Sequence, residues 1–193
     1  MTQPFPTDKK YKVIYADPPW SYTDKREKAG PKGNSAGSAA QHYTTMSAKQ
    51  IRDLPVADLA DDPCLLFMWG TWPLMTQWNE VIEAWGFKYK TLGFDWVKQY
   101  PKSGKICIGA GAYTRSNSEV CLIAVRGKGA SLIKDHSVRN VQLAPRGVHS
   151  AKPALFRDLI VQLVGDVPRI ELFARNETTG WDVWGNETDK LNT

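Results

Sequence analysis

The apolar residues of this chain are gathered in short runs that are separated by longer polar segments. Residues 13–16 and 64–69 are continuously apolar, and the second run is bounded by Pro63 and Gly70. Short continuous runs of this kind are typical of strands buried on both faces of a sheet. The same pattern predicts strands over residues 11–16, 64–69, 120–125 and 169–173.

Two other segments have the signals of helices. Apolar residues over positions 74–85 recur at helical spacing, and Gly86 is suited to end that helix. The tryptophans in this stripe are expected to lie in the core. Ser47 can cap a short helix that continues to about residue 54 and stops at Pro55.

The second half of the chain continues the alternation of strands and helices. Residues 87–98 predict one or two strands broken near Gly93, and residues 138–143 predict an edge strand. A helix is expected over residues 153–164 with Ser150 as its cap, because proline is favourable near a first turn. The predicted class is therefore α/β, with a mostly parallel sheet.

Composition and charge indicate the number of domains, the kind of partner and the cellular location to expect, but they do not identify the function. The chain has 193 residues, which predicts a single domain over 1–193 with a loose lead-in at residues 1–10. A formal charge of +5 suits a polyanionic partner. The 3 cysteines form no close pair, so neither a disulfide framework nor a metal site is indicated, and a reducing cytoplasm is the expected location. No stretch is long enough to span a membrane.

The candidate chemistry begins where the first predicted strand ends, at Asp17-Pro18-Pro19-Trp20. Ligands of open α/β sheets bind beyond the carboxyl ends of the strands. The Asp17 carboxylate and the Pro18 carbonyl can both accept N–H groups, and Trp20 offers a flat face. This combination suits a planar, conjugated amine such as the exocyclic amine of adenine, held out of a base stack. The alternative is an ordinary turn after a strand.

The tetrapeptide resembles the catalytic motif of the MT-A family of S-adenosylmethionine-dependent adenine methyltransferases. That family includes the catalytic subunit of the eukaryotic messenger-RNA methyltransferase and many bacterial and phage DNA-modifying members. The resemblance continues in the same order at Tyr43-Thr44-Thr45-Met46-Ser47, Trp96-Val97-Lys98, Glu119-Val120-Cys121-Leu122, Val125-Arg126-Gly127, His149-Ser150-Ala151-Lys152-Pro153, Glu171-Leu172-Phe173-Ala174-Arg175 and Trp184-Gly185-Asn186-Glu187.

The resemblance implies a Rossmann-like fold with helices on both faces of the sheet and a permuted motif order, catalytic half first and cofactor half last. It implies a catalytic set of Asp17, Pro18, Pro19 and Trp20, and S-adenosylmethionine as the cofactor. The expected cofactor-binding residues are Asp17, Lys152, Arg175, Asn176, Asn186 and Glu187. Lys152 would pair with the methionine carboxylate, and Arg175 and Asn176 have donors suited to ribose hydroxyls. The alternative for Lys152 and Arg175 is a solvated position at the end of an element.

The sequence departs from the family at two points. Eukaryotic relatives meet the cofactor adenine partly through residues well upstream of the tetrapeptide, and here only residues 1–16 precede Asp17. No residue is therefore assigned to the adenine ring. The family ends its last motif in Gly-Asn-Gln, whereas this chain has Glu187, which keeps an acceptor and loses the amide donor.

Two polar loops are expected to contact the nucleic acid. Residues 21–45 follow the tetrapeptide and contain Lys25, Arg26 and Lys28, which suggests a lid whose cations meet phosphates. Residues 99–118 interleave aromatic residues with cations and are the candidate for target recognition. Each could equally be an ordinary solvated loop. The cations expected to contact nucleic acid are Lys25, Arg26, Lys28, Lys102, Lys105 and Arg115.

Two further residues are expected beside the target base. By resemblance, Tyr43 would contact the base opposite Trp20, and Glu119 would lie near it; the alternative for Glu119 is a surface carboxylate at a strand start. The expected function is methyl transfer to the N6 amine of adenine in DNA. So small a chain has little room for a recognition domain, which indicates either a short target or help from a second copy, as in a homodimer.

Three alternatives to this function differ in substrate or in activity. RNA methylation is the nearest alternative. An inactive nucleic-acid-binding partner of the same fold is another. Enzymes that methylate protein glutamine form a third class, and they usually have Asn where this chain has Asp17.

Overall fold

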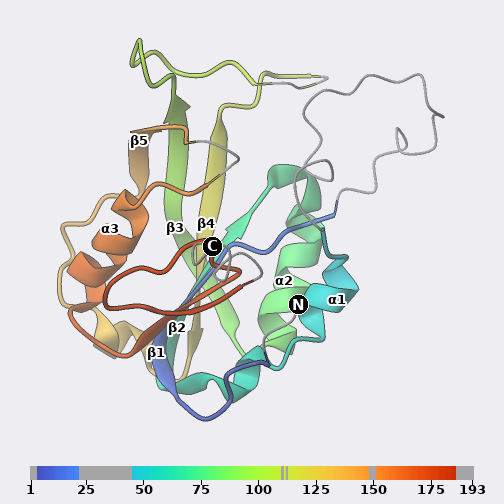
Figure 1. The fold of residues 1–193 in the computed structure, drawn as a ribbon, viewed down its shortest axis with the longest axis vertical. Coiled ribbons are helices and arrows are strands. Elements are labelled where there is room, and N and C mark those ends of the chain that lie inside the picture. Colours follow the sequence, from blue (N-terminus) through green and yellow to red (C-terminus); the bar gives the residue numbers. More distant parts are fainter. Residues whose placement is uncertain (1–3, 22–44, 110, 112, 148–150, 186–193) are drawn as a thin grey trace, which may run out of the picture.

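A seven-stranded sheet forms the centre of the computed structural model, which describes residues 4–21, 45–109, 111, 113–147 and 151–185 (Figure 1). The strand order is β5-β3-β4-β2-β1-β6-β7. β4 is antiparallel to both of its neighbours, and the other four strand pairs are parallel. The strands are β1 (Tyr11–Ala16), β2 (Ala60–Gly70), β3 (Lys88–Gln99), β4 (Ser118–Arg126), β5 (Val141–Pro145), β6 (Arg169–Leu172) and β7 (Asp182–Trp184).

Helices cover both faces of this sheet, as expected for the Rossmann-like class (Figure 1). The helices α1 (Ala48–Arg52) and α2 (Met75–Ala84) lie on one face and α3 (Leu155–Val164) on the other. Strand β1 serves both cores, because Ile14 packs with α2 while Tyr15 packs with α3. Short 3-10 turns occur at η3 (Val56–Asp58), η4 (Trp72–Leu74) and η5 (Gly129–Leu132).

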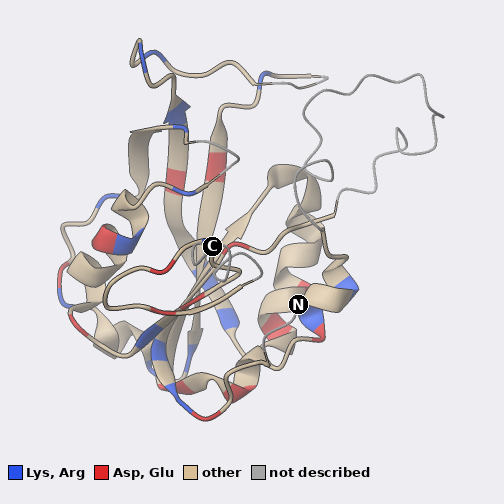
Figure 2. Ribbon diagram, viewed as in Figure 1, with Lys and Arg blue, Asp and Glu red and all other residues tan. Residues whose placement is uncertain are grey.

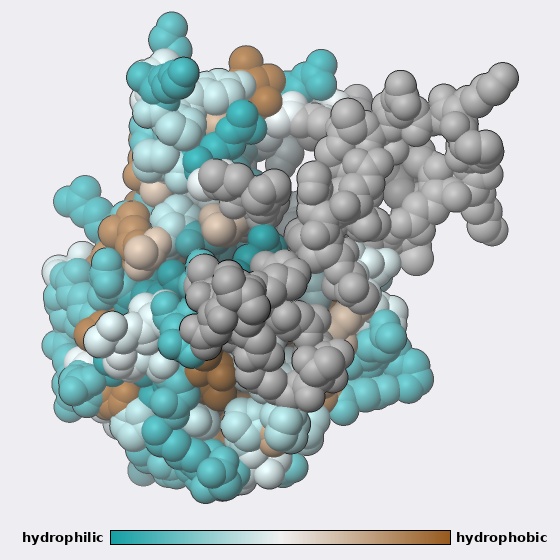
Figure 3. Space-filling model, in the orientation of Figure 1, coloured by the Kyte–Doolittle hydropathy of each residue, from teal (hydrophilic) through white to brown (hydrophobic). Residues whose placement is uncertain are grey.

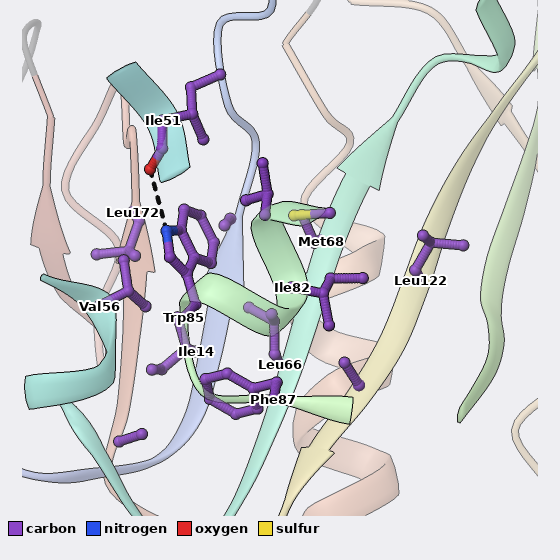
Figure 4. Close-up of a cluster of buried hydrophobic side chains, with 14 of the residues drawn as sticks. Ile14, Ile51, Val56, Leu66, Met68, Ile82, Trp85, Phe87, Leu122 and Leu172 are labelled. Atoms are coloured by element: carbon purple, nitrogen blue, oxygen red, sulfur yellow. Dashed lines mark hydrogen bonds between the residues drawn. The ribbon is translucent and has the colours of Figure 1, made fainter. Parts of the chain in front are cut away.

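Buried tryptophans belong to the core on the α1–α2 face, and Figure 4 shows one of them, Trp85, among apolar side chains. Trp85 is fully buried, and its Nε1 donates a hydrogen bond to the Ile51 carbonyl at 3.0 Å. This bond ties the end of α2 to α1 and satisfies the indole N–H. Trp78 is also buried, so the prediction that these tryptophans are core residues is confirmed.

The stronger local signals correspond to the observed elements. The first strand has the predicted bounds, and the buried run at residues 64–69 lies within β2. Ser47 caps α1 in a capping box with Gln50, in which each residue bonds the other's backbone N–H. Gly86 follows α2 with a φ of 80°, which places it in the left-handed region.

Two weaker predictions need correction, and one strand was not predicted. Residues 88–99 form one strand, within the prediction of one or two, and its pairing with β4 shifts register between Leu92 and Phe94. A Cβ on Gly93 would lie 2.9 Å from the Ile123 side chain, so the glycine permits close approach to β4. The edge strand begins at Val141, because the Asn140 side chain accepts the Val141 N–H just before pairing with β3 starts. α3 begins at Leu155, later than predicted, and the proposed cap Ser150 lies outside the described residues. β7 was not predicted.

None of the helices in the described part of the chain has the length and apolar character needed to cross a membrane. The three cysteines are free and buried. Within the described residues no group of three or more potential metal ligands is assembled.

Candidate active site

The topology brings several polar side chains to one edge of the sheet. Asp17 follows β1, Lys98 lies near the end of β3, and the segment containing Arg175 follows β6. These strands are parallel, so their carboxyl ends share an edge. β4 runs in the opposite direction, so its beginning, with Glu119, lies at the same edge. This is the edge at which open α/β sheets bind ligands.

Backbone hydrogen bonds hold the Asp-Pro-Pro-Trp tetrapeptide in place. The Trp20 N–H donates to the Pro18 carbonyl at 2.9 Å, and the Met46 N–H donates to the Pro19 carbonyl at 2.8 Å. The Ser21 N–H donates to the Met46 carbonyl at 2.9 Å. The Pro18 carbonyl has a second lone pair, so it can still accept another hydrogen bond.

Trp20 anchors the tetrapeptide to the core. Its side chain is 6% exposed, and its Nε1 donates to the Trp69 carbonyl at the end of β2, at 3.1 Å. The indole therefore connects the tip of β1 to the tip of β2. Stacking of Trp20 on a target base stays a prediction.

Asp17 and Lys152 contact each other directly across 135 positions of sequence. The Lys152 ammonium donates to both carboxylate oxygens of Asp17, at 2.8 and 2.7 Å. The Lys152 side chain is only 8% exposed, so its charge requires the paired carboxylates. The predicted catalytic residue and the predicted cofactor-binding residue thus meet in one site.

Glu119 and Lys98 extend this pair into a chain of alternating charges. Glu119 lies 3.2 Å from the Lys152 ammonium and also forms an ion pair with Lys98. Burial would raise the pKa of Glu119, but the two ammonium groups outweigh it and hold the pKa at about 2. Burial would likewise lower the pKa of Lys152, and the carboxylates of Asp17 and Glu119 raise it above its ordinary value. Both groups stay charged at neutral pH.

Aromatic rings form the floor beneath the two ammonium groups. Lys152 lies over the Trp69 ring at 5.1 Å from its centroid, and Lys98 lies over the Trp96 ring at the same distance. Trp69 Nε1 donates to the Tyr15 hydroxyl at 2.7 Å, and Trp96 Nε1 donates to the Ala144 carbonyl. Cation–π contacts of this kind attract both ammonium groups to the rings beneath them.

The ends of β6 and β7 make a close-packed wall beside Asp17. The Ala174 N–H donates to the Trp184 carbonyl at 3.1 Å, and a Cβ on Gly185 would lie 2.0 Å from the Ala174 carbonyl oxygen. Only glycine fits this approach. The Asp17 N–H points back to the Leu172 carbonyl at 3.5 Å, so the tip of β1 lies against the end of β6. Arg175 comes next along the chain.

The MT-A70 family model matches residues 11–187. This chain belongs to the MT-A70 family. It is 39% identical to the type II methyltransferase M.MunI of Mycoplasma sp over 189 residues, which cover 93% of this chain and 78% of that protein.

Two further relatives are less similar and longer. Identity is 28% to the human N(6)-adenine-specific methyltransferase METTL4, over 95% of this chain and 38% of that protein. It is 32% to the N6-methyladenosine RNA methyltransferase MTA1 of Cryphonectria parasitica, over 94% of this chain and 52% of that protein. The chain therefore spans about half or less of these two relatives.

The predicted site residues of this MT-A70 protein fall into three groups. Asp17, Lys152 and Glu119 are brought together. Arg175 is half-buried and Asn176 exposed, both just beyond β6. The third group falls outside the described residues: Tyr43, Lys25, Arg26, Lys28, Asn186 and Glu187. The other predicted residues lie in the tetrapeptide described above, Pro18, Pro19 and Trp20, or in the loop described next, Lys102, Lys105 and Arg115.

The predicted recognition loop forms the protruding connection between β3 and β4 (Figure 2). Its cations Lys102, Lys105 and Arg115 are exposed. Outside this loop, Arg146 lies 5.2 Å from the Tyr100 ring centroid, adding a cation that the sequence did not single out. On the face shown in Figure 3, the described surface is mostly hydrophilic, with scattered apolar groups.

Lys98 is the site residue whose role sequence reasoning missed. In the sequence it belongs to Trp96-Val97-Lys98, a motif that resembles the family. The available signal was position: a lysine near the carboxyl end of a parallel strand faces the same edge as Asp17.

Proposed function

We propose that this MT-A70 protein is an S-adenosylmethionine-dependent DNA methyltransferase that acts on the N6 amine of adenine. The observation that carries the proposal is the contact between Asp17, at the tip of β1, and Lys152, from the cofactor half of the chain. The contact brings the residue proposed to hold the target amine next to the residue proposed to hold the cofactor, at one edge of the sheet. Adenine N6 is also the specificity for which the relative METTL4 is named.

The charges at this edge fit S-adenosylmethionine. The cofactor has a carboxylate, an ammonium and a sulfonium, and the site offers the Lys152 ammonium together with the carboxylates of Asp17 and Glu119. Arg175 and Asn176, with Asn186 and Glu187 beyond them, are proposed to hold the ribose. When bound, the cofactor supplies a methyl group activated by its positive sulfur. MT-A70 methyltransferases generally use this cofactor.

The residues of the chain would orient the amine of the target base. An Asp17 oxygen and the free lone pair of the Pro18 carbonyl are proposed to accept the two N–H groups of the amine. Two such acceptors favour a pyramidal nitrogen whose lone pair is available for attack. Trp20 and Tyr43 are proposed to hold the base. Most of the acceleration would come from proximity and orientation.

In the same proposal, pairing of Lys152 with the carboxylate of the cofactor releases at least one oxygen of Asp17. Glu119 lowers the free-energy cost of this release, because Lys152 remains 3.2 Å from a second carboxylate that is ionised at neutral pH. Lys98 in turn keeps Glu119 paired. The alternating charges thus let Lys152 exchange partners without becoming an unpaired buried charge.

DNA is the proposed substrate because M.MunI, at 39% identity, is a type II methyltransferase. RNA is the second candidate, favoured by the 32% identity to MTA1. In either case Lys102, Lys105 and Arg115 on the protruding loop are proposed to contact phosphates, as are Lys25, Arg26 and Lys28. A cytoplasmic location and participation of a second copy in recognition belong to the same proposal.

Side-by-side incubation of the protein with labelled S-adenosylmethionine and duplex DNA, single-stranded DNA or RNA tests the function. Mass spectrometry of the released nucleosides should find N6-methyladenine, most abundantly from DNA. Greater incorporation into RNA would favour the second candidate. Calorimetry that detects no S-adenosylmethionine binding would favour an inactive partner of the same fold.

A further inference from the structure

A second buried ion pair lies near the edge of the sheet that carries Asp17, Lys152 and Glu119, which we call the catalytic edge because the proposed active site is there. Arg157 Nε and Nη2 donate to the two carboxylate oxygens of Glu171, at 2.6 and 2.8 Å. The Arg157 and Glu171 side chains are 15% and 6% exposed. This two-point geometry is specific to arginine, because a lysine ammonium cannot present a planar pair of donors.

A buried ion pair of this kind contributes little net stability to the fold, so stability alone does not account for it. Burial raises the pKa of Glu171, and the Arg157 guanidinium opposes that rise. Apolar residues of similar size often replace buried ion pairs without loss of stability. A role in fixing local geometry explains the pair better.

The position of the pair suggests what it fixes. Arg157 lies in the first turn of α3, directly after the segment that contains Lys152. Glu171 lies in β6, directly before the segment that contains Arg175. The pair therefore links the two segments that carry cofactor-binding residues.

A second connection runs beneath the site. The Arg157 guanidinium lies 6.0 Å from the centroid of the Tyr15 ring. The Tyr15 hydroxyl accepts the Trp69 Nε1–H at 2.7 Å, and the Trp69 ring lies beneath the Lys152 ammonium. Arg157 is thus connected to Lys152 both along the chain and through the aromatic floor.

We propose that Arg157, held by Glu171 and supported by Tyr15, is a positioning residue that places Lys152 for cofactor binding. The inference rests on the proposed function of Lys152. It concerns residues to which the proposed function assigns no contact with the target base or the cofactor. Their substitution should therefore weaken cofactor affinity while leaving nucleic-acid affinity unchanged.

Arg157→Met tests this, with Arg126→Met as the matched control. Arg126 is also a partly buried arginine, and its Nη1 donates to the Ala57 carbonyl at 2.8 Å near the opposite edge of the sheet. Calorimetry with S-adenosylmethionine should give a dissociation constant about tenfold higher for Arg157→Met, by analogy with the loss of a residue that orients a metal ligand. Arg126→Met should lower the melting temperature and leave that constant unchanged.

Two milder variants cover the case in which Arg157→Met does not fold. Arg157→Lys keeps the charge and removes the two-point geometry, and Tyr15→Phe removes only the acceptor for Trp69. Both should raise the cofactor dissociation constant and leave duplex DNA binding, measured by fluorescence anisotropy, as in the wild type. Unchanged cofactor affinity in these variants, or an equal loss in Arg126→Met, would overturn the proposal. Failure of the wild type itself to bind S-adenosylmethionine would instead contradict the proposed function.

Discussion

The two edges of the sheet both carry ion pairs, and they differ in how deeply the charges are buried. At the opposite edge, Lys9 pairs with Asp182 at 2.6 Å with side chains that are 54% and 45% exposed. At the catalytic edge, Asp17, Lys152 and Glu119 are largely shielded from solvent. Exposed pairs of the first kind contribute little to stability. Buried alternating charges of the second kind are the arrangement expected at the proposed active site.

The largest expected difference between the edges concerns catalysis. Asp17→Ala should lower the rate of methyl transfer by about 10²–10³-fold, because it removes an acceptor aimed at the reacting amine. Cofactor affinity, measured by calorimetry, should fall much less than the rate, because Lys152 and Glu119 remain in the site. Asp166→Ala is the control from the other edge, where the Asp166 side chain is 92% exposed, and it should be fully active. Comparable turnover in Asp17→Ala would remove this carboxylate from catalysis.

The same contrast applies to stability. Arg157→Met leaves Glu171 as an unpaired buried charge and should cost about 3–5 kcal/mol in the free energy of unfolding. Lys9→Met breaks an exposed pair and should cost about 0–1 kcal/mol. Urea denaturation of both variants measures the two costs. Equal costs would mean that the depth of burial does not distinguish the edges.

Lowering the pH tests how much the buried ion pairs at the catalytic edge contribute to stability. The folded pKa of Glu119 is about 2, below its ordinary value of 4.5, so its stabilising contribution is complete above pH 4.5 and is lost as the pH falls towards 2. Unfolding free energies at pH 6 and pH 3 should therefore differ more in the wild type than in Glu119→Gln. An identical pH dependence in the two proteins would show that Glu119 is not ion-paired in solution.

The smallest expected effect lies on the protruding loop between β3 and β4. Replacing Lys102, Lys105 and Arg115 together by Gln should weaken DNA binding and reduce the slope of log affinity against log salt by roughly one for each phosphate that is no longer neutralised. Methyl transfer at saturating DNA should be unaffected. Lys88→Gln, Lys90→Gln and Lys134→Gln, combined, remove the same charge elsewhere on the surface. An equal weakening in this control would assign the effect to net charge alone.

The sequence was most informative where burial alone determines the structure. The continuous apolar runs of β1 and β2 predicted both strands, and the tetrapeptide located the tip of β1 correctly. β7 escaped prediction because it has only three residues, too few to form a recognisable pattern. The predicted range of β5 was displaced along the chain, because the start of this strand depends on the side chain of Asn140 and on register with β3.

The sequence singled out residues that the structure brings together, and it did not predict their contacts. Asp17 and Lys152 were predicted to bind the cofactor and Glu119 to lie near the target base, but the ion pairs among the three were not predicted. Their mutual ion pairing depends on strand order and on β4 running against its neighbours, which places Glu119 at the catalytic edge. Lys98 was missed for the same reason, because its partner lies on the adjacent antiparallel strand.

The reversed direction of β4 has a consequence for how such enzymes can diversify. The connection between β3 and β4 departs from the sheet just beyond Lys98 and re-enters it just before Glu119, so both of its attachment points adjoin the proposed active site. Lengthening, shortening or exchanging this excursion would alter what is presented to the substrate while every strand pairing stays in register. A change of sequence preference could therefore arise by replacing one surface segment, without redesign of the catalytic machinery.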